Sequence, residues 1–285
     1  IWDYVNQFAE FKQYTHNVIA NYKGEMYTLP FNMWTFNQLW GVKTEEEAKE
    51  ILEKQRYKGE VKNLEDQARS MVGNDIYEKL INGYTVKQWD KPCDELPPSI
   101  IKRLPVRFTW DSNYFNDKYT GMPIGGYTQI FEKMLEGSDV WLNKDYFEDR
   151  DYYNNLADKV IYTGPIDKFF DYQFGKLDYR SLRWETDILE KDNFQGVPVV
   201  NYTDLKISYT RILEHKWFDH QNQKGTIISY EHPAAYDGNN EPYYPIRDDK
   251  NTETYKKYQE LSEGLNGVIF GGRLARYVYY DMHQV

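Results

Sequence analysis

Residues 250–273 read KNTETYKKYQELSEGLNGVIFGGR, and this stretch decides the fold class. Its first two thirds suit a helix, and three apolar residues, 268–270, then predict a short strand that runs into two glycines. A helix followed by such a strand is typical of an α/β domain. Residues 159–163 predict a second buried strand, which ends at Gly164 and Pro165.

Upstream of this stretch, residues 178–232 predict an antiparallel sheet. They contain three strand-like runs, at 197–200, 206–212 and 226–230. Sequential strands with short connections pair antiparallel. Closer to the N-terminus, residues 18–32 predict a hairpin around a Lys-Gly turn.

A helical block is predicted over residues 33–104. Thr44 stands three residues before Glu47, which is the spacing of a capping box at a helix start. Gly73 and Gly83 follow helical patterns and are expected to end two further helices. The segment after Gly83 is therefore expected to be a loop.

The composition argues against several classes of protein. The formal net charge is −10, from 45 acidic against 35 basic residues, which excludes the basic face of a nucleic-acid-binding protein. No apolar run is long enough to span a membrane. One cysteine, Cys93, makes no internal disulfide and favours a reducing compartment, so a cytoplasmic protein is expected.

The common catalytic motifs are missing. The sequence has no Walker loop, no G-x-G-x-x-G, no H-E-x-x-H and no G-x-S-x-G, and its five histidines lack metal-ligand spacing, so no metal is expected. Several segments instead place aromatic residues beside arginine. Arginine binds diphosphates through its planar fork, and tyrosine offers a flat face and a hydroxyl. Taken alone, this pattern suits core aromatics with surface charges as well as a nucleotide-sugar site.

Nine segments together resemble the UDP-galactopyranose mutase family. They occur in the order of the family and cover nearly the whole chain: 29–33, 83–89, 95–108, 113–119, 121–128, 162–167, 209–216, 242–246 and 271–282. The resemblance implies a flavin-dependent isomerase that interconverts UDP-galactopyranose and UDP-galactofuranose through a reduced-flavin N5–sugar adduct, with no net redox. It also implies FAD as cofactor, UDP-galactose as partner molecule and, by analogy, a homodimer.

The resemblance assigns roles to individual residues. Arg103 and Arg211 correspond to two catalytic arginines that bind the diphosphate. The residues implied to contact substrate are Tyr84, Thr85, Trp89, Tyr114, Asn201, Tyr244, Tyr279, Asp281 and His16. Arg273 and Trp2 correspond to residues on the flavin side.

The resemblance also implies the domain organisation. The expected fold is mixed α/β, with a discontinuous FAD-binding α/β domain, an inserted helical domain and a twisted antiparallel sheet domain. The FAD-binding parts are 1–8, 121–178 and 249–285, the helical domain is 33–104, and the sheet domain is 9–32, 105–120 and 179–248.

This chain departs from the family at several points. The flavin fingerprint is absent, and the family's closing helix is not found, so the natural chain is expected to begin before Ile1. His16 replaces an asparagine, and Asp90 replaces a glycine. Two alternatives are a flavin-less fragment that only binds UDP or a UDP-sugar, and a different flavoenzyme of the amine oxidase type.

Overall fold

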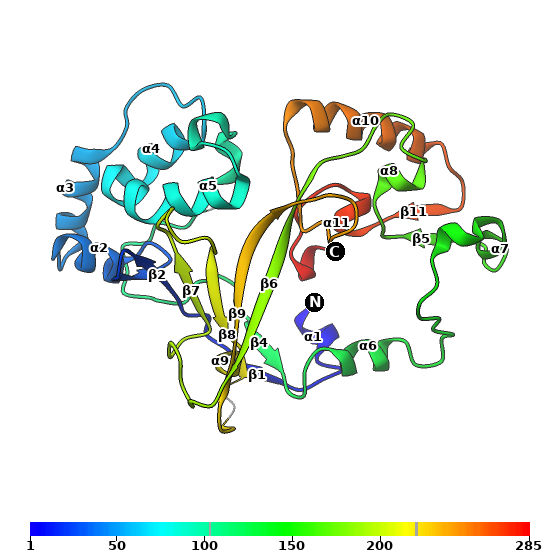
Figure 1. Ribbon diagram of the computed structural model, residues 1–285, viewed down its shortest axis with the longest axis horizontal. Helices are drawn as coiled ribbons and strands as arrows, with labels where there is room; N and C mark the ends of the chain where they lie inside the picture. The colour runs from blue at the N-terminus through cyan, green and yellow to red at the C-terminus, as the bar shows by residue number, and fades with distance from the viewer. Residues whose placement is uncertain (103, 220–221) are drawn as a thin grey trace. The chain divides into compact units, whose positions relative to one another are not determined.

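The computed structural model describes residues 1–102, 104–219 and 222–285. The fold is mixed α/β, and the chain forms two compact units, each assembled from separate stretches (Figure 1). Unit 1 comprises residues 1–8, 127–181 and 234–285, and unit 2 comprises 9–126 and 182–233. The three-domain division given by the sequence stays a prediction.

A seven-stranded mixed sheet is the framework of unit 2. Its strands lie in the order β10, β6, β9, β8, β7, β2, β3. Their bounds are Tyr244–Pro245, Tyr179–Leu189, Thr226–Ala235, Arg211–Glu214, Val199–Tyr202, Val18–Tyr22 and Glu25–Leu29. β6 and β9 contribute residues to both units, and β10 belongs to unit 1.

The prediction of an antiparallel sheet is wrong for one pair of strands. The hairpin β2–β3 around Lys23-Gly24 is confirmed, but β2 pairs parallel with β7, with Val18 opposite Val199. Short turns impose antiparallel pairing only on consecutive strands. Because the long helical block separates the hairpin from β7 in the chain, β7 is free to enter beside β2 in either direction.

One predicted strand is displaced. The run 206–212 was expected to be extended, whereas β8 begins only at Arg211. The carbonyls of Tyr202, Asp204 and Tyr209 accept hydrogen bonds from the Lys87 ammonium group, so this stretch forms a loop around a side chain.

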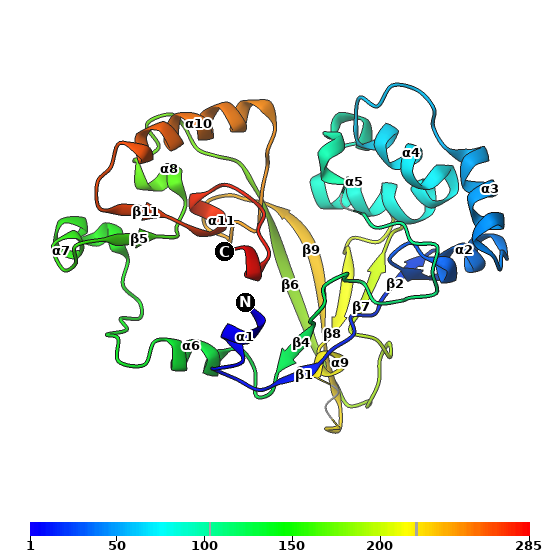
Figure 2. The same cartoon turned by 180° about the vertical axis from the view of Figure 1, so that it is seen from behind.

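The helices of unit 2 cover the hairpin side of this sheet (Figures 1 and 2). The covering segments are α2, α3, α4, a π-helical turn and α5, with bounds Met33–Trp40, Glu45–Gln55, Leu64–Ile76, Tyr77–Asn82 and Gly83–Trp89. Unit 2 also contains the short helix α9 (Lys216–Asp219), which lies away from them. The capping box at Thr44 and Glu47 is confirmed. Short 3₁₀ turns at Cys93–Glu95 and Pro98–Ile100 follow α5, and β1 (Phe11–Gln13) pairs antiparallel with β4 (Gly121–Pro123).

The expected stop at Gly83 is wrong. Gly83 has helical backbone angles, and the helix ends at Asp90, which adopts the left-handed conformation. A Cβ atom at Gly83 would lie 2.1 Å from the Thr203 carbonyl oxygen. Glycine is therefore needed here for close packing of a helix on a loop, not for a helix end. Gly73, with φ +76°, does interrupt its helix.

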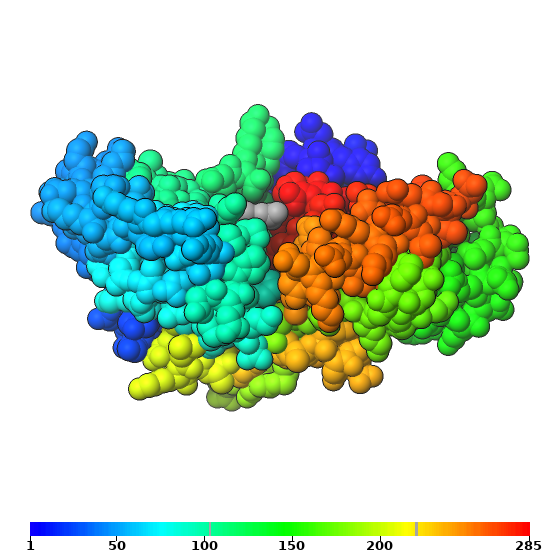
Figure 3. Space-filling model, turned by 90° about the horizontal axis from the view of Figure 1, so that it is seen from above, coloured from blue at the N-terminus to red at the C-terminus, as the bar shows by residue number. Residues whose placement is uncertain are grey.

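Unit 1 contains a smaller α/β arrangement. β5 (Val160–Tyr162) and β11 (Val268–Phe270) pair in parallel, and α10 (Asp249–Glu263) precedes β11, as the sequence predicts. α10 forms part of the surface seen in Figure 3. The remaining helices are short: α1 (Trp2–Val5), α6 (Thr128–Met134), α7 (Arg150–Asn154), α8 (Ile166–Phe169) and α11 (Gly272–Ala275). In the part of the chain described, no helix combines the length and apolar character needed to cross a membrane.

Candidate functional site

A cavity of about 190 Å³ lies in unit 2 between α5 and the sheet. α5 supplies Tyr84, Thr85, Gln88 and Trp89 to its wall, and Asn201 enters from β7. The remaining lining is apolar apart from Tyr114 and consists of Leu29, Pro30, Phe31, Leu64, Leu80, Ile81, Ile100, Ile101 and Leu104. The cavity therefore offers flat aromatic and apolar surfaces with a few polar groups, which is typical of a small-molecule site.

The helical form of residues 83–89 explains why its side chains converge. Tyr84 and Gln88 are four residues apart, as are Thr85 and Trp89, so both pairs lie along one face of α5. The predicted loop would not have fixed this alignment. Because the segment is a helix, Tyr84, Thr85 and Trp89 face the same cavity.

Asn201 lines this cavity and has one side-chain atom that lacks a hydrogen-bond partner. Its Oδ1 atom is buried and finds no hydrogen-bond partner among the described residues. A buried acceptor without a donor destabilises a protein by about 1–3 kcal/mol, so such atoms usually meet a partner. A ligand N–H or O–H donor in the cavity would supply that partner.

His16 lies in an aromatic cluster next to Tyr114. The Tyr114 backbone N–H donates to the His16 carbonyl oxygen at 3.0 Å, and the Tyr14 hydroxyl lies 2.8 Å from His16 Nδ1. The rings of Phe115 and Phe218 stack on the imidazole. Burial, and secondly the positive charge of Arg211, lower the pKa of His16 to about 4. The imidazole is therefore neutral at physiological pH.

Arg211 is fixed by a carboxylate that sequence reasoning missed. Its Nε donates to Glu231 Oε2 at 2.8 Å, and its Nη2 donates to the same oxygen. Glu231 is fully buried and also accepts a 2.9 Å hydrogen bond from Thr210 Oγ1. The sequence held no signal for it, because an acidic residue directly after the predicted strand 226–230 is ordinary, whereas β9 in fact continues to Ala235 and carries Glu231 inside the sheet.

The other predicted site residues that the structure describes lie in unit 1, where three of them touch. The rings of Tyr244 and Tyr279 stack with centroids 5.6 Å apart, and the Arg273 guanidinium lies 4.0 Å from the Tyr279 centroid. Asp281 caps the last 3₁₀ turn, Met282–Gln284, and Trp2 begins α1. Arg103 lies outside the described residues.

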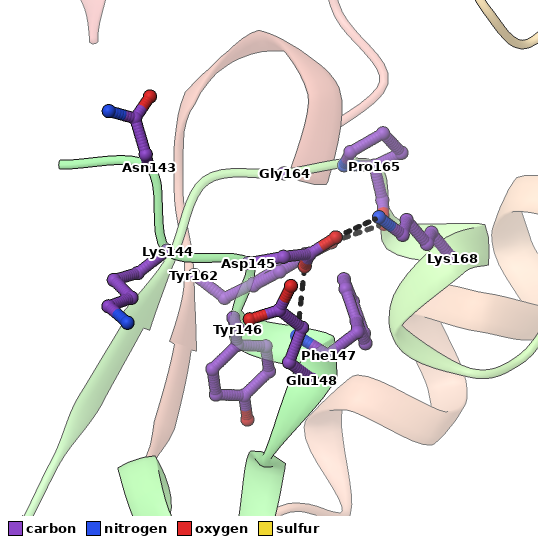
Figure 4. Close-up of a pocket in the computed structure, with 10 residues that line it drawn as sticks. All are labelled: Asn143, Lys144, Asp145, Tyr146, Phe147, Glu148, Tyr162, Gly164, Pro165 and Lys168. Atoms are coloured by element: carbon purple, nitrogen blue, oxygen red, sulfur yellow. Dashed lines mark hydrogen bonds and ion pairs between the residues drawn. The ribbon is translucent and has the colours of Figure 1, made fainter.

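A larger hollow of about 550 Å³ lies on unit 1 (Figure 4). Asp145 and Lys168 face each other there, 3.4 Å apart, and Asp145 accepts a 2.9 Å hydrogen bond from the Phe147 N–H. That hydrogen bond, with the Lys168 charge as a smaller cause, lowers the pKa of Asp145. None of the site residues predicted from the sequence lines this hollow, and two of its charged groups, Asp145 and Lys168, are paired with each other.

Within the described ranges, no group of three or more His, Cys, Asp or Glu residues is placed to hold a metal ion. The chemistry that this arrangement offers is binding and orientation: an aromatic and apolar cavity with an orphaned acceptor, and an arginine held rigidly at a strand end.

Comparison with known proteins gives consistent relatives. The family model described as "GLF: UDP-galactopyranose mutase" matches residues 79–279. A "Probable UDP-galactopyranose mutase" of Klebsiella pneumoniae is 39% identical over 99% of this chain and 74% of that protein. A "dTDP-fucopyranose mutase" of Escherichia coli is 35% identical over 99% of this chain and 77% of that protein.

A solved structure described as "Crystal structure of reduced UDP-Galactopyranose mutase" shares the fold, with a TM-score of 0.64. The superposed region covers 96% of this chain and 75% of the chain in the solved structure, with 12% sequence identity. The resemblance found in the sequence segments is confirmed by these comparisons.

Proposed function

The chain belongs to the UDP-galactopyranose mutase family, and from that premise we propose that it interconverts UDP-galactopyranose and UDP-galactofuranose without net redox. The observation that carries this proposal is the cavity of unit 2 with its orphaned Asn201 Oδ1. Uracil has a flat ring and a single imide N–H, which match an aromatic wall and one buried acceptor.

Each site residue of unit 2 has a role in this proposal. Tyr84 packs on the base, Thr85 and Trp89 contact the uridine side, and Asn201 accepts from the imide N–H. Arg211 binds the diphosphate, and its two bonds to buried Glu231 keep it oriented before substrate arrives. Such preorganisation favours departure of UDP from the sugar, because the leaving charge meets a fixed cation.

The residues near the sugar would control protons and charge. His16 is neutral at physiological pH, so beside Arg211 it offers a hydrogen-bonding ring and no second positive charge. The remaining residues take the roles that the family resemblance implies: Arg103, Tyr114, Tyr244 and Tyr279 contact the phosphates, and Asp281 lies near the sugar.

The family is flavin-dependent, and this chain fits a flavin only in part. A Cβ atom at Gly271 would meet nothing within 4 Å, so there is room beside the turn between β11 and α11. Arg273 is held there by the hydrogen bond from its Nε to the Tyr280 carbonyl, at 2.6 Å. The sequence contains no G-x-G-x-x-G loop, the usual cradle for the FAD pyrophosphate. Arg273 and Trp2 are the residues proposed to contact FAD, and reduced flavin, when bound, supplies the nucleophile for the anomeric carbon.

A second candidate substrate is a dTDP-linked 6-deoxy sugar, since one relative is named a dTDP-fucopyranose mutase. Thymine shares the imide N–H of uracil and adds a methyl group, and the apolar lining of the cavity suits a methyl group.

The test is turnover by flavin-loaded, dithionite-reduced protein. We expect UDP-galactofuranose to be converted to UDP-galactopyranose, which is detected by chromatography. We expect dTDP-fucofuranose to react more slowly. Faster reaction of the dTDP-sugar would assign the second substrate, and no reaction of either would refute the mutase proposal.

A separate observation distinguishes the flavin-less alternative. Purified protein that holds flavin is yellow, whereas a chain that only binds UDP or a UDP-sugar is colourless and still shows heat on titration with UDP.

A further inference from the structure

We propose that Lys87 is a positioning residue for the nucleotide cavity: its ammonium group joins α5 to the loop between β7 and β8 and so fixes the two walls of the cavity relative to each other. This inference rests on the proposed function. Lys87 itself does not line the cavity.

The Lys87 ammonium group uses all of its donors on backbone carbonyls. Its Nζ atom lies 2.6 Å from the Tyr202 carbonyl oxygen, 3.1 Å from that of Asp204 and 2.8 Å from that of Tyr209. These carbonyls are 115 to 122 residues away in the sequence. An ammonium group has three N–H donors and no acceptor, so each carbonyl receives one.

The same loop is attached at two further points, one on the helical segment and one on β2. Thr203 Oγ1 donates to the Lys79 carbonyl oxygen at 2.6 Å, and the Thr203 backbone N–H donates to Asn21 on β2 at 3.0 Å. Gly83 lets the helix approach the Thr203 carbonyl closely. The loop therefore contacts the helical segment at Lys79, Gly83 and Lys87, and Lys87 is the contact closest to Trp89. These contacts together are called the seat of the loop.

This seat connects the groups proposed to bind the nucleotide. Tyr84 and Trp89 stand on the helical wall, and Asn201 directly precedes Tyr202, whose carbonyl Lys87 holds. Tyr209 stands two residues before Arg211. Asn201 and Arg211 lie opposite each other where β7 pairs with β8, so a shift of the loop at this strand end would displace the base acceptor and the diphosphate arginine together.

The charge of Lys87 is sensitive to pH near neutrality. Burial lowers its pKa to about 8, and the negative charge of Asp204 on the same loop opposes this shift. Other titratable groups of unit 2 have pKa values farther from neutrality: burial lowers the pKa of His16 to about 4 and raises those of Cys93 and Tyr202 to about 11 and about 12. As the pH rises through about 8, Lys87 becomes a neutral amine with two donors for three carbonyls, and the seat loosens.

The chain offers a matched control. Lys216 Nζ also donates to two backbone carbonyls of unit 2, those of Asp192 at 2.6 Å and Gln223 at 3.0 Å, but Lys216 is not part of the cavity lining. Lys216→Met thus removes a buried lysine of the same chemistry without touching the proposed seat.

The experiment is calorimetric titration of oxidised protein with UDP-galactose, whose uracil imide loses part of its proton toward the upper end of this pH range; that loss is common to every variant and is removed by comparing their profiles. Between about pH 7 and pH 9 the dissociation constant of the unsubstituted protein should rise by up to about tenfold, since only the protonated fraction keeps the seat. Lys87→Met should show a dissociation constant raised by about tenfold at about pH 7 and little further change with pH. Lys216→Met should keep the pH profile of the unsubstituted protein.

A folded Lys87→Met variant with unchanged affinity would overturn the inference, as would a flat pH profile of the unsubstituted protein. If Lys87→Met does not fold, the test rests on how the dissociation constant depends on pH in the unsubstituted protein and in Lys216→Met. A rise in both supports the inference, and a flat profile overturns it. Absence of binding by the unsubstituted protein would instead count against the proposed function.

Discussion

Unit 2 and unit 1 are stabilised in different ways. Unit 2 has one continuous apolar core that joins the hairpin to the helices, with Phe36, Leu64 and Ile76 fully buried. Unit 1 has two small aromatic clusters, and its parallel strands leave Ile161 and Ile269 at 70% and 50% exposure. Parallel strands are ordinarily covered on both faces. Burial of apolar side chains therefore holds the cavity residues of unit 2 in place. In unit 1, hydrogen bonds from hydroxyl groups to carbonyl oxygens and ring stacking hold the predicted site residues.

The largest test of this contrast is a pair of core truncations. Phe36 is fully buried and stacks on Trp40, so Phe36→Ala should lower the free energy of unfolding by about 3–5 kcal/mol. Phe169→Ala in unit 1 should cost about 2–3 kcal/mol, because its cluster is smaller. Urea unfolding of both variants measures this, and an equal or reversed order would refute the contrast.

The next test concerns function within unit 2. Arg211→Ala should lower kcat/KM by at least about a hundredfold, equivalent to about 2.7 kcal/mol, while flavin stays bound. Arg103→Ala should likewise remove most activity and keep flavin. Steady-state kinetics with the flavin absorbance spectrum check both, and near-normal turnover of either variant would show that its arginine is wrongly assigned.

Two buried carboxyl groups should make the units respond oppositely to acid. Glu214 in unit 2 accepts N–H bonds from residues 194–196 and a bond from Thr226, and although burial opposes them, these bonds leave its pKa lowered. Its contribution is therefore present above the unfolded pKa and is lost as pH falls through the folded pKa. Burial raises the pKa of Asp167 in unit 1, so its charge destabilises the fold increasingly as pH rises above the unfolded pKa.

Glu214→Gln should therefore cost about 1–3 kcal/mol at about pH 7 and less at about pH 3. Asp167→Asn should have the opposite pH trend. Thermal unfolding across this range, with hydrogen exchange to separate the units, measures both trends. Parallel trends for the two variants would contradict the assigned pKa directions.

The smallest expected effect lies in the tyrosine network of unit 1. The Tyr277 hydroxyl lies 2.6 Å from the Asp178 carbonyl oxygen and 2.7 Å from that of Ile246. Tyr277→Phe keeps the buried ring, so we expect a loss of about 1 kcal/mol, with exchange protection reduced near these two residues. Loss of less than about 0.3 kcal/mol would show that ring packing alone holds unit 1.

Much of the candidate site was predictable from the sequence because its residues lie in long family-like segments. Tyr84, Thr85 and Trp89 line one cavity with Tyr114 and Asn201, although their segment is a helix and not the expected loop. Glu231 and Lys87 were not predicted as site residues, since a lone acidic residue or lysine in a sequence does not reveal its partner. Their partners are 20 or more than 100 residues distant.

The sequence by itself determined the family and the mixed α/β class. It also determined helix caps and turns such as the Thr44 cap and the Lys23-Gly24 turn, because these depend on neighbouring residues. The tertiary structure alone decided that Gly83 lies within a helix, that β2 and β7 run parallel, and that Lys87 collects three carbonyls. The physical reason is range: a cap or turn is satisfied within a few residues, whereas packing space and buried donors are matched only when distant segments meet.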